Sequence, residues 1–254
     1  MMTQQPFFTT LKGRGTLKIS GIERKDFLQA LITNDIERLT PETCLYSCLL
    51  SPQGKFMFDF FIHEQDEALI MDCEGGSRLK DLAQMLNMYK LRRDVNITID
   101  DHTDLYAIFG TDKYGYKDPR HPDMGYRSFE KPKDIIEGNW QDWDLTRISL
   151  TVPDGSRDME PKKSTMDEAR LDQLNAVSYE KGCYIGQELT ARMHYRGLGK
   201  KHLYTVTPAT FGMKTFPKAG DAIEFENKNV GEMRSSCNEL GIALIKDSFA
   251  EKVL

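Results

Sequence analysis

KGCYIGQELTAR, residues 181–192, is the most distinctive stretch of this 254-residue sequence. Two glycines bracket Cys183, and the residues from Gln187 onward favour the start of a helix. A thiol near a helix N-terminus, with Lys181 beside it, experiences a positive potential that stabilises the thiolate. Such a cysteine can act as a nucleophile, a redox-sensitive group or a transient ligand to a metal on a partner. The alternative is a small buried hydrophobe, because most free cysteines are buried and inert.

Shorter segments on both sides of this stretch extend it into a family pattern. In chain order they are Phe27-Leu28-Gln29, Thr33-Asn34-Asp35, Ser51-Pro52-Gln53-Gly54-Lys55, Tyr89-Lys90-Leu91-Arg92, Asp118-Pro119-Arg120, Glu168-Ala169-Arg170-Leu171, Val177-Ser178-Tyr179, Tyr195-Arg196-Gly197 and Lys200-Lys201. With them the chain resembles, over most of its length, the YgfZ family. These proteins are folate-binding relatives of the glycine cleavage system T-protein (GcvT) and include mitochondrial iron–sulfur assembly factors.

The resemblance implies an α+β fold, a three-domain ring of the T-protein folate-binding type with a small C-terminal β-barrel. Residues 1–198 would form the folate-binding region. One of its subdomains would span about residues 1–42 plus 106–198 and the other about residues 43–105. Residues 199–254 would form the barrel, which agrees with the short strand-like segments separated by Gly, Pro and Asn in this part of the chain.

The resemblance also implies a ligand, tetrahydrofolate or a derivative, bound in the central hole of the ring. Glu168 would face the amino nitrogens of the pterin, since a carboxylate accepts two parallel hydrogen bonds from an aminopyrimidine edge. The other residues assigned to this site are Asn34, Asp35, Tyr184, Gln187 and Arg192. From the residues alone, Glu168 can equally be a solvated carboxylate at a helix start, and Asn34 with Asp35 can simply cap a helix end.

A basic group follows the cysteine stretch and has two interpretations. It can meet the glutamate tail of folate or an acidic partner, or it can be ordinary solvated surface. Its two histidines have no His or Cys companions at zinc-ligand spacing. The members of the group are Arg192, His194, Arg196, Lys200, Lys201 and His202.

The predicted function is that of a tetrahydrofolate-binding accessory protein for the assembly or repair of iron–sulfur clusters. Cys183 would be the reactive thiolate or transient ligand, with Lys181 tuning it, and the partners would be reduced folate and iron–sulfur assembly proteins or client enzymes. A folate-responsive binding module without turnover is a second way to perform this function.

The alternative is a folate-dependent aminomethyltransferase. T-protein carries paired aspartates where this chain reads Phe58-Asp59, and a phenyl ring cannot position or protonate a folate nitrogen. On a strand, Asp59 points to the opposite face from Phe58 and so does not replace the missing carboxylate. The chain shows no complete catalytic set, and no enzymatic activity is assigned to it.

Composition and charge argue against a membrane protein, a secreted protein and a nucleic-acid-binding protein. Hydrophobic residues make up 39% of the chain, mean hydropathy is −0.52, and no apolar run reaches the roughly 20 residues that a bilayer requires. The N-terminus lacks the basic and apolar regions of a secretory signal, so we expect a cytoplasmic protein without a membrane partner. A net charge of −5 argues against nucleic-acid binding. We expect a monomer.

The five cysteines predict neither a disulfide framework nor a metal site. Their number is odd and no C-x-x-C occurs. Cys44 and Cys48 would lie roughly 13 Å apart on one strand, too far to hold one metal ion.

Hydrophobic periodicity predicts the local elements. Helices are expected at about residues 23–31 and from Ser77, as N-cap, to about residue 89. A long ordered loop is expected at 110–132 and a polar surface excursion at 153–163. Strands are expected at 16–20, 45–50, 56–62, 68–72, 95–99, 105–109, 145–152, 203–207, 222–226 and 241–245.

Overall fold

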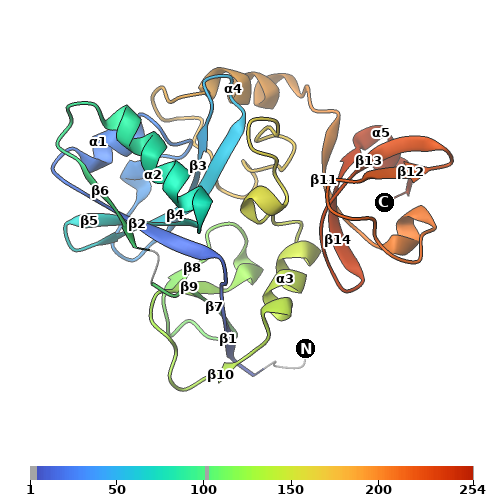
Figure 1. Cartoon of the computed structure of the whole chain (residues 1–254), viewed down its shortest axis with the longest axis horizontal. Helices are drawn as coiled ribbons and strands as arrows, with labels where there is room; N and C mark the ends of the chain where they lie inside the picture. Colours follow the sequence, from blue (N-terminus) through green and yellow to red (C-terminus); the bar gives the residue numbers. More distant parts are fainter. Residues whose placement is uncertain (1–4, 101–102, 254) are drawn as a thin grey trace.

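The computed structural model describes residues 5–100 and 103–253. Within them the chain forms three β-sheets with helices packed between and around them. Figure 1 shows the sheet made by the C-terminal part of the chain at one end of the molecule, beside the body formed by the other two sheets. The α-helices are α1 (Arg24–Gln29), α2 (Ser77–Lys90), α3 (Trp140–Ser149), α4 (Gln187–Arg196) and α5 (Asp247–Val253).

The first sheet has the strand order β10-β1-β7-β9-β8. Its β1 and β7 are antiparallel, whereas β1 and β10 are parallel. The expected loop at residues 110–132 supplies two short strands of this sheet and a 3-10 turn. The strands are β1 (Phe7–Thr10), β7 (Tyr106–Phe109), β8 (Tyr116–Lys117), β9 (Tyr126–Ser128) and β10 (Ile136–Glu137), and the turn is η2 (Pro122–Met124).

The second sheet has the order β3-β4-β5-β2-β6, and all of its pairs are antiparallel. In Figure 1 it lies on the side of the molecule opposite the sheet of the C-terminal part of the chain. Residues 14–20, expected in the first subdomain, pair here with strands of the second. The strands are β2 (Arg14–Ser20), β3 (Leu45–Leu50), β4 (Phe56–Gln65), β5 (Ala68–Glu74) and β6 (Asn96–Asp100).

Strands β3 and β4 are buried along nearly their whole length because both faces of the sheet are covered. Met57 and Phe58 belong to the apolar cluster under helices α1 and α2, whereas Phe56 and Phe61 belong to the cluster on the other face. Burial on both faces explains why this sequence reads as continuous apolar runs rather than as an alternation. Helix α2 begins at Ser77 itself, and its N-cap is Gly76, not the serine expected from the sequence.

The third sheet is open, so the predicted C-terminal barrel is not confirmed. Its order is β11-β14-β13-β12, and β11 and β12 at its edges do not pair with each other. The sequence prediction missed strand β13 because polar residues and glycine occupy much of it, and the alternation of buried residues is confined to Met233, Ser235 and Cys237. The strands are β11 (Lys201–Val206), β12 (Ala222–Phe225), β13 (Lys228–Cys237) and β14 (Leu240–Lys246).

The strand predicted at 145–152 is wrong, because most of this segment is the second half of helix α3. The helix begins after Asn139, whose side chain accepts a hydrogen bond from the Gln141 amide at 3.3 Å. The Asp142 carboxylate in turn accepts a hydrogen bond from the Asn139 amide at 3.3 Å. Its buried face carries Trp143 and Arg147 at i and i+4. The capping pair Asn139 and Asp142 indicates a helix start, whereas the spacing of the apolar residues favoured a strand.

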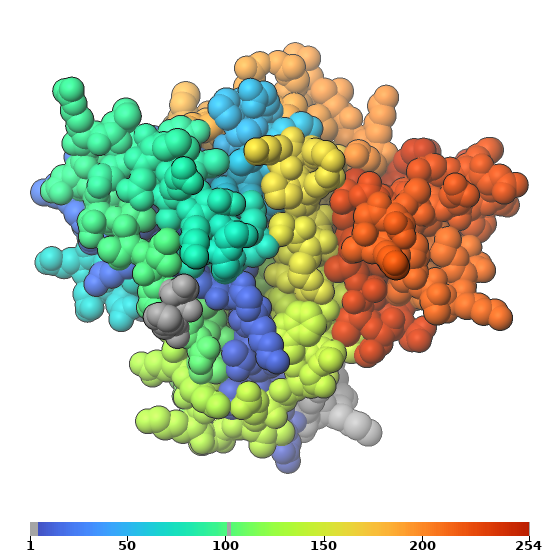
Figure 2. Space-filling model, viewed as in Figure 1, coloured from blue at the N-terminus to red at the C-terminus, as the bar shows by residue number. Residues whose placement is uncertain are grey.

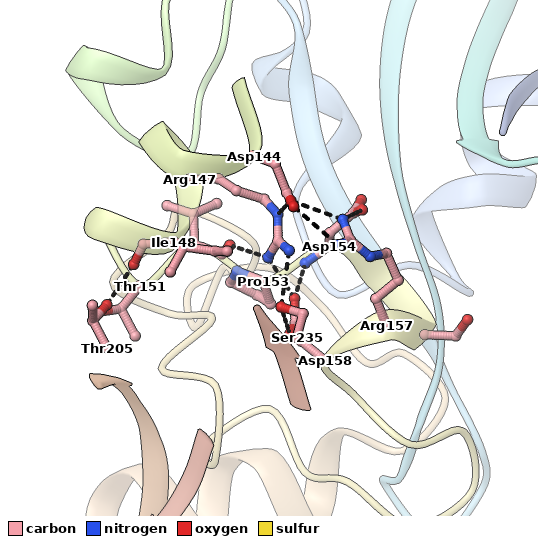
Figure 3. A network of polar contacts seen from close by, with 12 residues as sticks. Asp144, Arg147, Ile148, Thr151, Pro153, Asp154, Arg157, Asp158, Thr205 and Ser235 are labelled. Atoms are coloured by element: carbon pink, nitrogen blue, oxygen red, sulfur yellow. Dashed lines mark hydrogen bonds and ion pairs between the residues drawn. The ribbon is translucent and has the colours of Figure 1, made fainter. Parts of the chain in front are cut away.

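The surface excursion predicted at 153–163 is also wrong, since Asp158 and Met159 are buried. This segment contains η3 (Gly155–Arg157), and it contacts β5 through Ser156, α3 through Arg157 and the third sheet through Asp158. Figure 3 shows the polar network there, centred on the fully buried Arg147. Arg147 donates to Asp144 and Asp158 at 2.6 Å each and to Ser235 of β13 at 2.9 Å. The network ties the C-terminal sheet to the body of the molecule.

A buried histidine makes stability depend on acid pH. His63 of β4 is 3% exposed, and its ring packs on Phe129 and Tyr116 with centroids 4.4 and 4.9 Å away. Burial lowers its pKa to about 4. The folded state therefore binds this proton less readily than the unfolded state, and the stability present above pH 6.5 is lost as the pH falls toward 4. We expect His63→Phe to remove about 3 kcal/mol of the difference in unfolding free energy between pH 7 and pH 4. Denaturant titrations of both proteins at the two pH values measure this, and equal pH dependence would contradict it.

Candidate functional site

The segment 175–197 is held against a loop that the sequence analysis had singled out separately. Ser178 N donates to Thr33 O at 3.0 Å, and the Thr33 hydroxyl donates to Ala176 O at 2.7 Å. Asn34 Nδ2 donates to Asn175 O at 2.8 Å. The Thr33-Asn34-Asp35 motif is thus a docking site for the stretch that leads into the cysteine loop.

Two glycines from distant motifs allow a second close contact. Gly186, at the N-cap of α4, has φ +81°, and a Cβ on it would lie 2.5 Å from Ser51 O. A Cβ on Gly54 would lie 2.6 Å from Leu189 Cβ and 2.8 Å from Gly186 O. All three distances are too short for a Cβ atom at either position. The turn at 51–54 and the start of α4 therefore pack backbone against backbone, and both positions require glycine.

Lys181 anchors the cysteine loop to residues 29–34. Its Nζ donates to Gln29 O, Ile32 O and Asn34 O at 2.7, 2.8 and 2.8 Å. These carbonyls lie at and just beyond the C-terminal end of α1, where a cation is favoured. Burial lowers the pKa of Lys181 to about 8. All three N–H groups of Lys181 are used by these carbonyls, so Lys181 positions the loop; its tuning of the Cys183 thiol stays a prediction.

Cys183 is presented to solvent between two buried neighbours. Lys181 and Tyr184 are 8% and 7% exposed, whereas Cys183 is exposed and a Cβ on Gly182 would meet nothing within 4 Å. The Tyr184 ring packs in the apolar cluster on the inner face of the second sheet. The thiol is therefore accessible while its loop is fixed at both ends.

The other four cysteines are less accessible, and burial raises the pKa of each thiol. They are the half-buried Cys44 and the buried Cys48, Cys73 and Cys237.

A thiol reagent should therefore modify Cys183 first. We expect native protein at pH 7.5 to react at Cys183 at least about tenfold faster than at any other cysteine, since buried thiols react only after local opening. Mass spectrometry of partly labelled protein, with denatured protein as the reference for five accessible thiols, gives the rates. Equal labelling of Cys44 would show that exposure does not single out Cys183.

Lys181→Met should destabilise the fold and loosen this loop. Three carbonyls lose a charged donor, and hydrogen bonds to charged groups contribute about 1.5–3 kcal/mol, so we expect a loss of about 2–3 kcal/mol in unfolding free energy. Lys113→Met is the matched control, because Lys113 is 68% exposed and pairs with Asp134 at 3.5 Å on the surface; it should change stability by about 0.5 kcal/mol or less. Equal effects of the two substitutions would contradict the anchoring role.

Several of the residues predicted to bind folate make contacts within the chain, and their role in folate binding stays a prediction. Asn34 is 4% exposed, and its side chain is used by Tyr46 O, Asn175 O and Asp35 N, all at 2.8 Å. Asp35 caps η1 (Ile36–Arg38) by accepting from Glu37 N at 3.1 Å, as the capping interpretation allowed. The Tyr184 side chain is also buried, whereas Asp35 is half-buried.

Glu168 has partners on both of its carboxylate oxygens. Oε2 accepts from Thr165 N at 3.0 Å, and Oε1 pairs with Lys201 of β11 at 3.0 Å. A cavity lined by the preceding Met166 and Asp167 has a volume of about 10 Å³, room for roughly one water and not for a pteridine. Gln187 is the first residue of α4.

The basic group is largely paired with carboxylates rather than forming one free surface. Arg192 pairs with Glu188 at 2.5 Å on the exposed face of α4. His202 lies between Asp247 at 2.7 Å and Asp167 at 3.3 Å. His194 lies 3.4 Å from Asp172 and stacks on Tyr179 with centroids 3.9 Å apart. Arg196 and Lys200 are exposed.

Phe58 and Asp59 point to opposite faces of β4, as predicted. The Phe58 ring lies under the guanidinium of Arg78, 4.1 Å away, in the cluster beneath α2. Asp59 is 4% exposed and accepts from the Tyr46 hydroxyl at 2.9 Å, and its burial raises its pKa. Asp59 therefore does not take the place of the aspartate that Phe58 replaces.

Across residues 5–100 and 103–253, no group of three or more His, Cys, Asp or Glu side chains is arranged to hold a metal ion. The same residues contain no helix long and apolar enough to cross a membrane.

Comparison with known proteins identifies relatives of this chain, although no protein-family model matches it. The chain is 29% identical over 234 residues to the iron–sulfur cluster assembly factor IBA57 homolog, mitochondrial, of Mycosarcoma maydis, covering 80% of this chain and 57% of that protein. It is 28% identical over 285 residues to the iron–sulfur cluster assembly factor IBA57, mitochondrial, of Homo sapiens, covering 96% of this chain and 77% of that protein.

A solved structure shows the fold. The glycine cleavage system aminomethyltransferase T of Bartonella henselae superposes with a TM-score of 0.66 over 96% of this chain and 79% of that one, at 11% identity. The mixed α/β fold is therefore that of the T-protein, as the resemblance implied.

The relatives correct one prediction. The cytoplasmic location is contradicted, because the IBA57 proteins that match this chain are named as mitochondrial. The lack of a secretory signal and of a long apolar run does not distinguish the cytoplasm from the mitochondrion.

Proposed function

We propose that this chain, a homologue of the IBA57 factors with the T-protein fold, is an accessory protein for the assembly or repair of iron–sulfur clusters in client enzymes. The observation that carries the proposal is the exposed Cys183 thiol, presented on a loop between the buried Lys181 and Tyr184. Its partners would be iron–sulfur assembly proteins or the client enzymes themselves.

The chemistry of the thiol suits this role. A thiolate is the protein ligand that iron–sulfur clusters prefer. The described residues offer no set of ligands for a resident cluster, so Cys183 would contribute one ligand to a cluster that a partner carries. The fixed loop lowers the entropy lost when the thiol meets that partner, because its backbone is already ordered.

Binding of a reduced folate is a further part of the proposal and rests on the T-protein fold. The predicted residue set does not support it directly, since Asn34 and Tyr184 are buried. Glu168 gives the sharpest test, because its carboxylate is held only by Lys201 and one backbone amide. Tetrahydrofolate titrated against the wild type should quench the fluorescence of Trp140 and Trp143, and Glu168→Gln should weaken this at least about tenfold. Equal affinity would remove Glu168 from the site.

Cells that lack the gene test the proposed function. The activity of a cluster-dependent enzyme should fall in them and return when the wild-type chain is supplied, while an enzyme without a cluster stays unchanged. If the deletion leaves cluster enzymes untouched, cluster assembly is not the function. Glycine cleavage activity reconstituted with this chain in place of T-protein would then favour a one-carbon transferase.

A further inference from the structure

Helix α2 ends in a turn whose backbone does not suit the residue that occupies it. Arg93 N donates to Lys90 O at 3.0 Å, which closes a β-turn over residues 90–93. Leu91, its first central residue, has φ 52° and ψ −114°. These are the angles of a type II′ turn, in which that position normally holds glycine because a Cβ clashes there. A leucine at this position strains the backbone by about 1–2 kcal/mol.

The strained leucine is also exposed, together with two apolar neighbours. Leu91 is 84% exposed, Met88 is 61% exposed one helical turn earlier, and Ile22 is 83% exposed. The turn at 21–23 lies beside the turn at 91–94, since Glu23 N donates to Asp94 O at 3.3 Å and Asp94 N donates to the Glu23 carboxylate at 2.6 Å. We call Ile22, Met88 and Leu91 the Leu91 patch.

The patch lies at an outer edge of the molecule. In Figure 1 the C-terminal end of α2 is beside α1, at the opposite side from the sheet of β11–β14. In Figure 2 the same segment, in green, projects at the upper left.

The rim of the patch is positively charged in a chain whose net charge is −5. Lys90, Arg92 and Arg93 follow one another around Leu91, and within the described residues none of them has an acidic side chain at ion-pair distance. The nearby Glu23 is occupied by the Asp94 amide.

Backbone strain and an exposed leucine both cost free energy, and Leu91 remains 84% exposed among the described residues. We propose that the Leu91 patch is a docking surface for an acidic protein partner, whose apolar residues cover Leu91, Met88 and Ile22 while its carboxylates meet Lys90, Arg92 and Arg93. The cations select an acidic surface, and the rigid turn holds Leu91 out as the anchor. No residue of the Cys183 loop takes part, so failure of this inference would leave the proposed function standing.

Peptide binding to the full chain tests this surface. The probe is a 20-residue amphipathic helix with leucines on one face and glutamates on the other, and its partner probe carries lysines in place of the glutamates. Fluorescence anisotropy should show the acidic peptide binding at least about tenfold more tightly than the basic one. Leu91→Gly and the double variant Arg92→Glu, Arg93→Glu should each weaken it at least about tenfold. Ile136→Ser is the control, since Ile136 is 60% exposed on β10, and it should bind as the wild type does.

Thermal unfolding separates loss of a contact from loss of the fold. Leu91→Gly relieves the strained turn, so its Tm should be equal to that of the wild type or about 2–4 °C higher while peptide binding falls. Equal binding of both peptides, or unchanged binding by Leu91→Gly, would overturn the proposal. Two other results would also overturn it. Self-association of the wild type in sedimentation, abolished by Leu91→Gly, would assign the patch to a second copy of the chain. Preferential binding to anionic lipid vesicles would assign it to a membrane surface.

Discussion

Cys183→Ser should fail to restore cluster-dependent enzyme activity in cells that lack the gene, leaving it at the level of the deletion. Serine keeps the size and exposure of the side chain but replaces the soft sulfur ligand with a hydroxyl that iron–sulfur clusters do not favour. Because the side chain is exposed, unfolding free energy should change by about 0.5 kcal/mol or less. Enzyme activity in extracts and a denaturant titration of the purified variant measure the two effects.

The matched control is Cys237→Ala, which removes a buried thiol at the end of β13. It should restore activity as the wild type does, since this thiol is not accessible to a partner. Full rescue by Cys183→Ser would show that the exposed thiol has no part in the function.

Arg147→Met should destabilise the chain by about 3–5 kcal/mol, the largest stability effect that we expect. The guanidinium is fully buried and contacts Asp144, Asp158 and Ser235. Methionine fills much of the same space but leaves the buried Asp158 carboxylate without its counter-ion and leaves Asp144 with Arg157 alone. Because Ser235 belongs to the third sheet, the same change should weaken the attachment of that sheet, visible as faster hydrogen exchange in β13.

Arg157→Met is the control within the same network. Arg157 pairs with Asp144 and Asp154 at 2.8 and 2.9 Å, but 36% of its side chain is exposed. Water can solvate its carboxylate partners in place of these ion pairs, so loss of Arg157 should lower the unfolding free energy by about 1 kcal/mol. If both substitutions cost the same, burial of Arg147 would not be the source of its effect.

Much of the second sheet could be predicted from the sequence, because the patterns that indicate its strands and turns are local. The apolar runs of β3 and β4, the Ser51–Gly54 turn and the periodicity of α2 each depend on residues close together in the chain. The start of α4 after Gly186 was predicted in the same way. The prediction was wrong at helix α3 because the spacing of its apolar residues is also compatible with a strand. It missed β13 because that strand contains few apolar side chains.

The candidate site was predictable as a set of motifs but not as an arrangement. Cys183 was identified from its flanking glycines and from the family resemblance. The role of Lys181 was not, because three backbone carbonyls from residues 29–34 define it and a carbonyl has no sequence signature. The contact between Gly54 and Gly186 joins residues 132 positions apart, and only the fold brings them together.

Transfer of a cluster to an apo client enzyme tests the central role of Cys183 most directly. A [2Fe–2S]-loaded carrier protein is mixed with the apo enzyme under anaerobic conditions, and recovery of enzyme activity is followed with no addition, with the wild-type chain and with Cys183→Ser. The wild-type chain should accelerate recovery, and Cys183→Ser should give the rate seen without addition. Equal acceleration by both proteins would contradict the assignment of the function to this thiol.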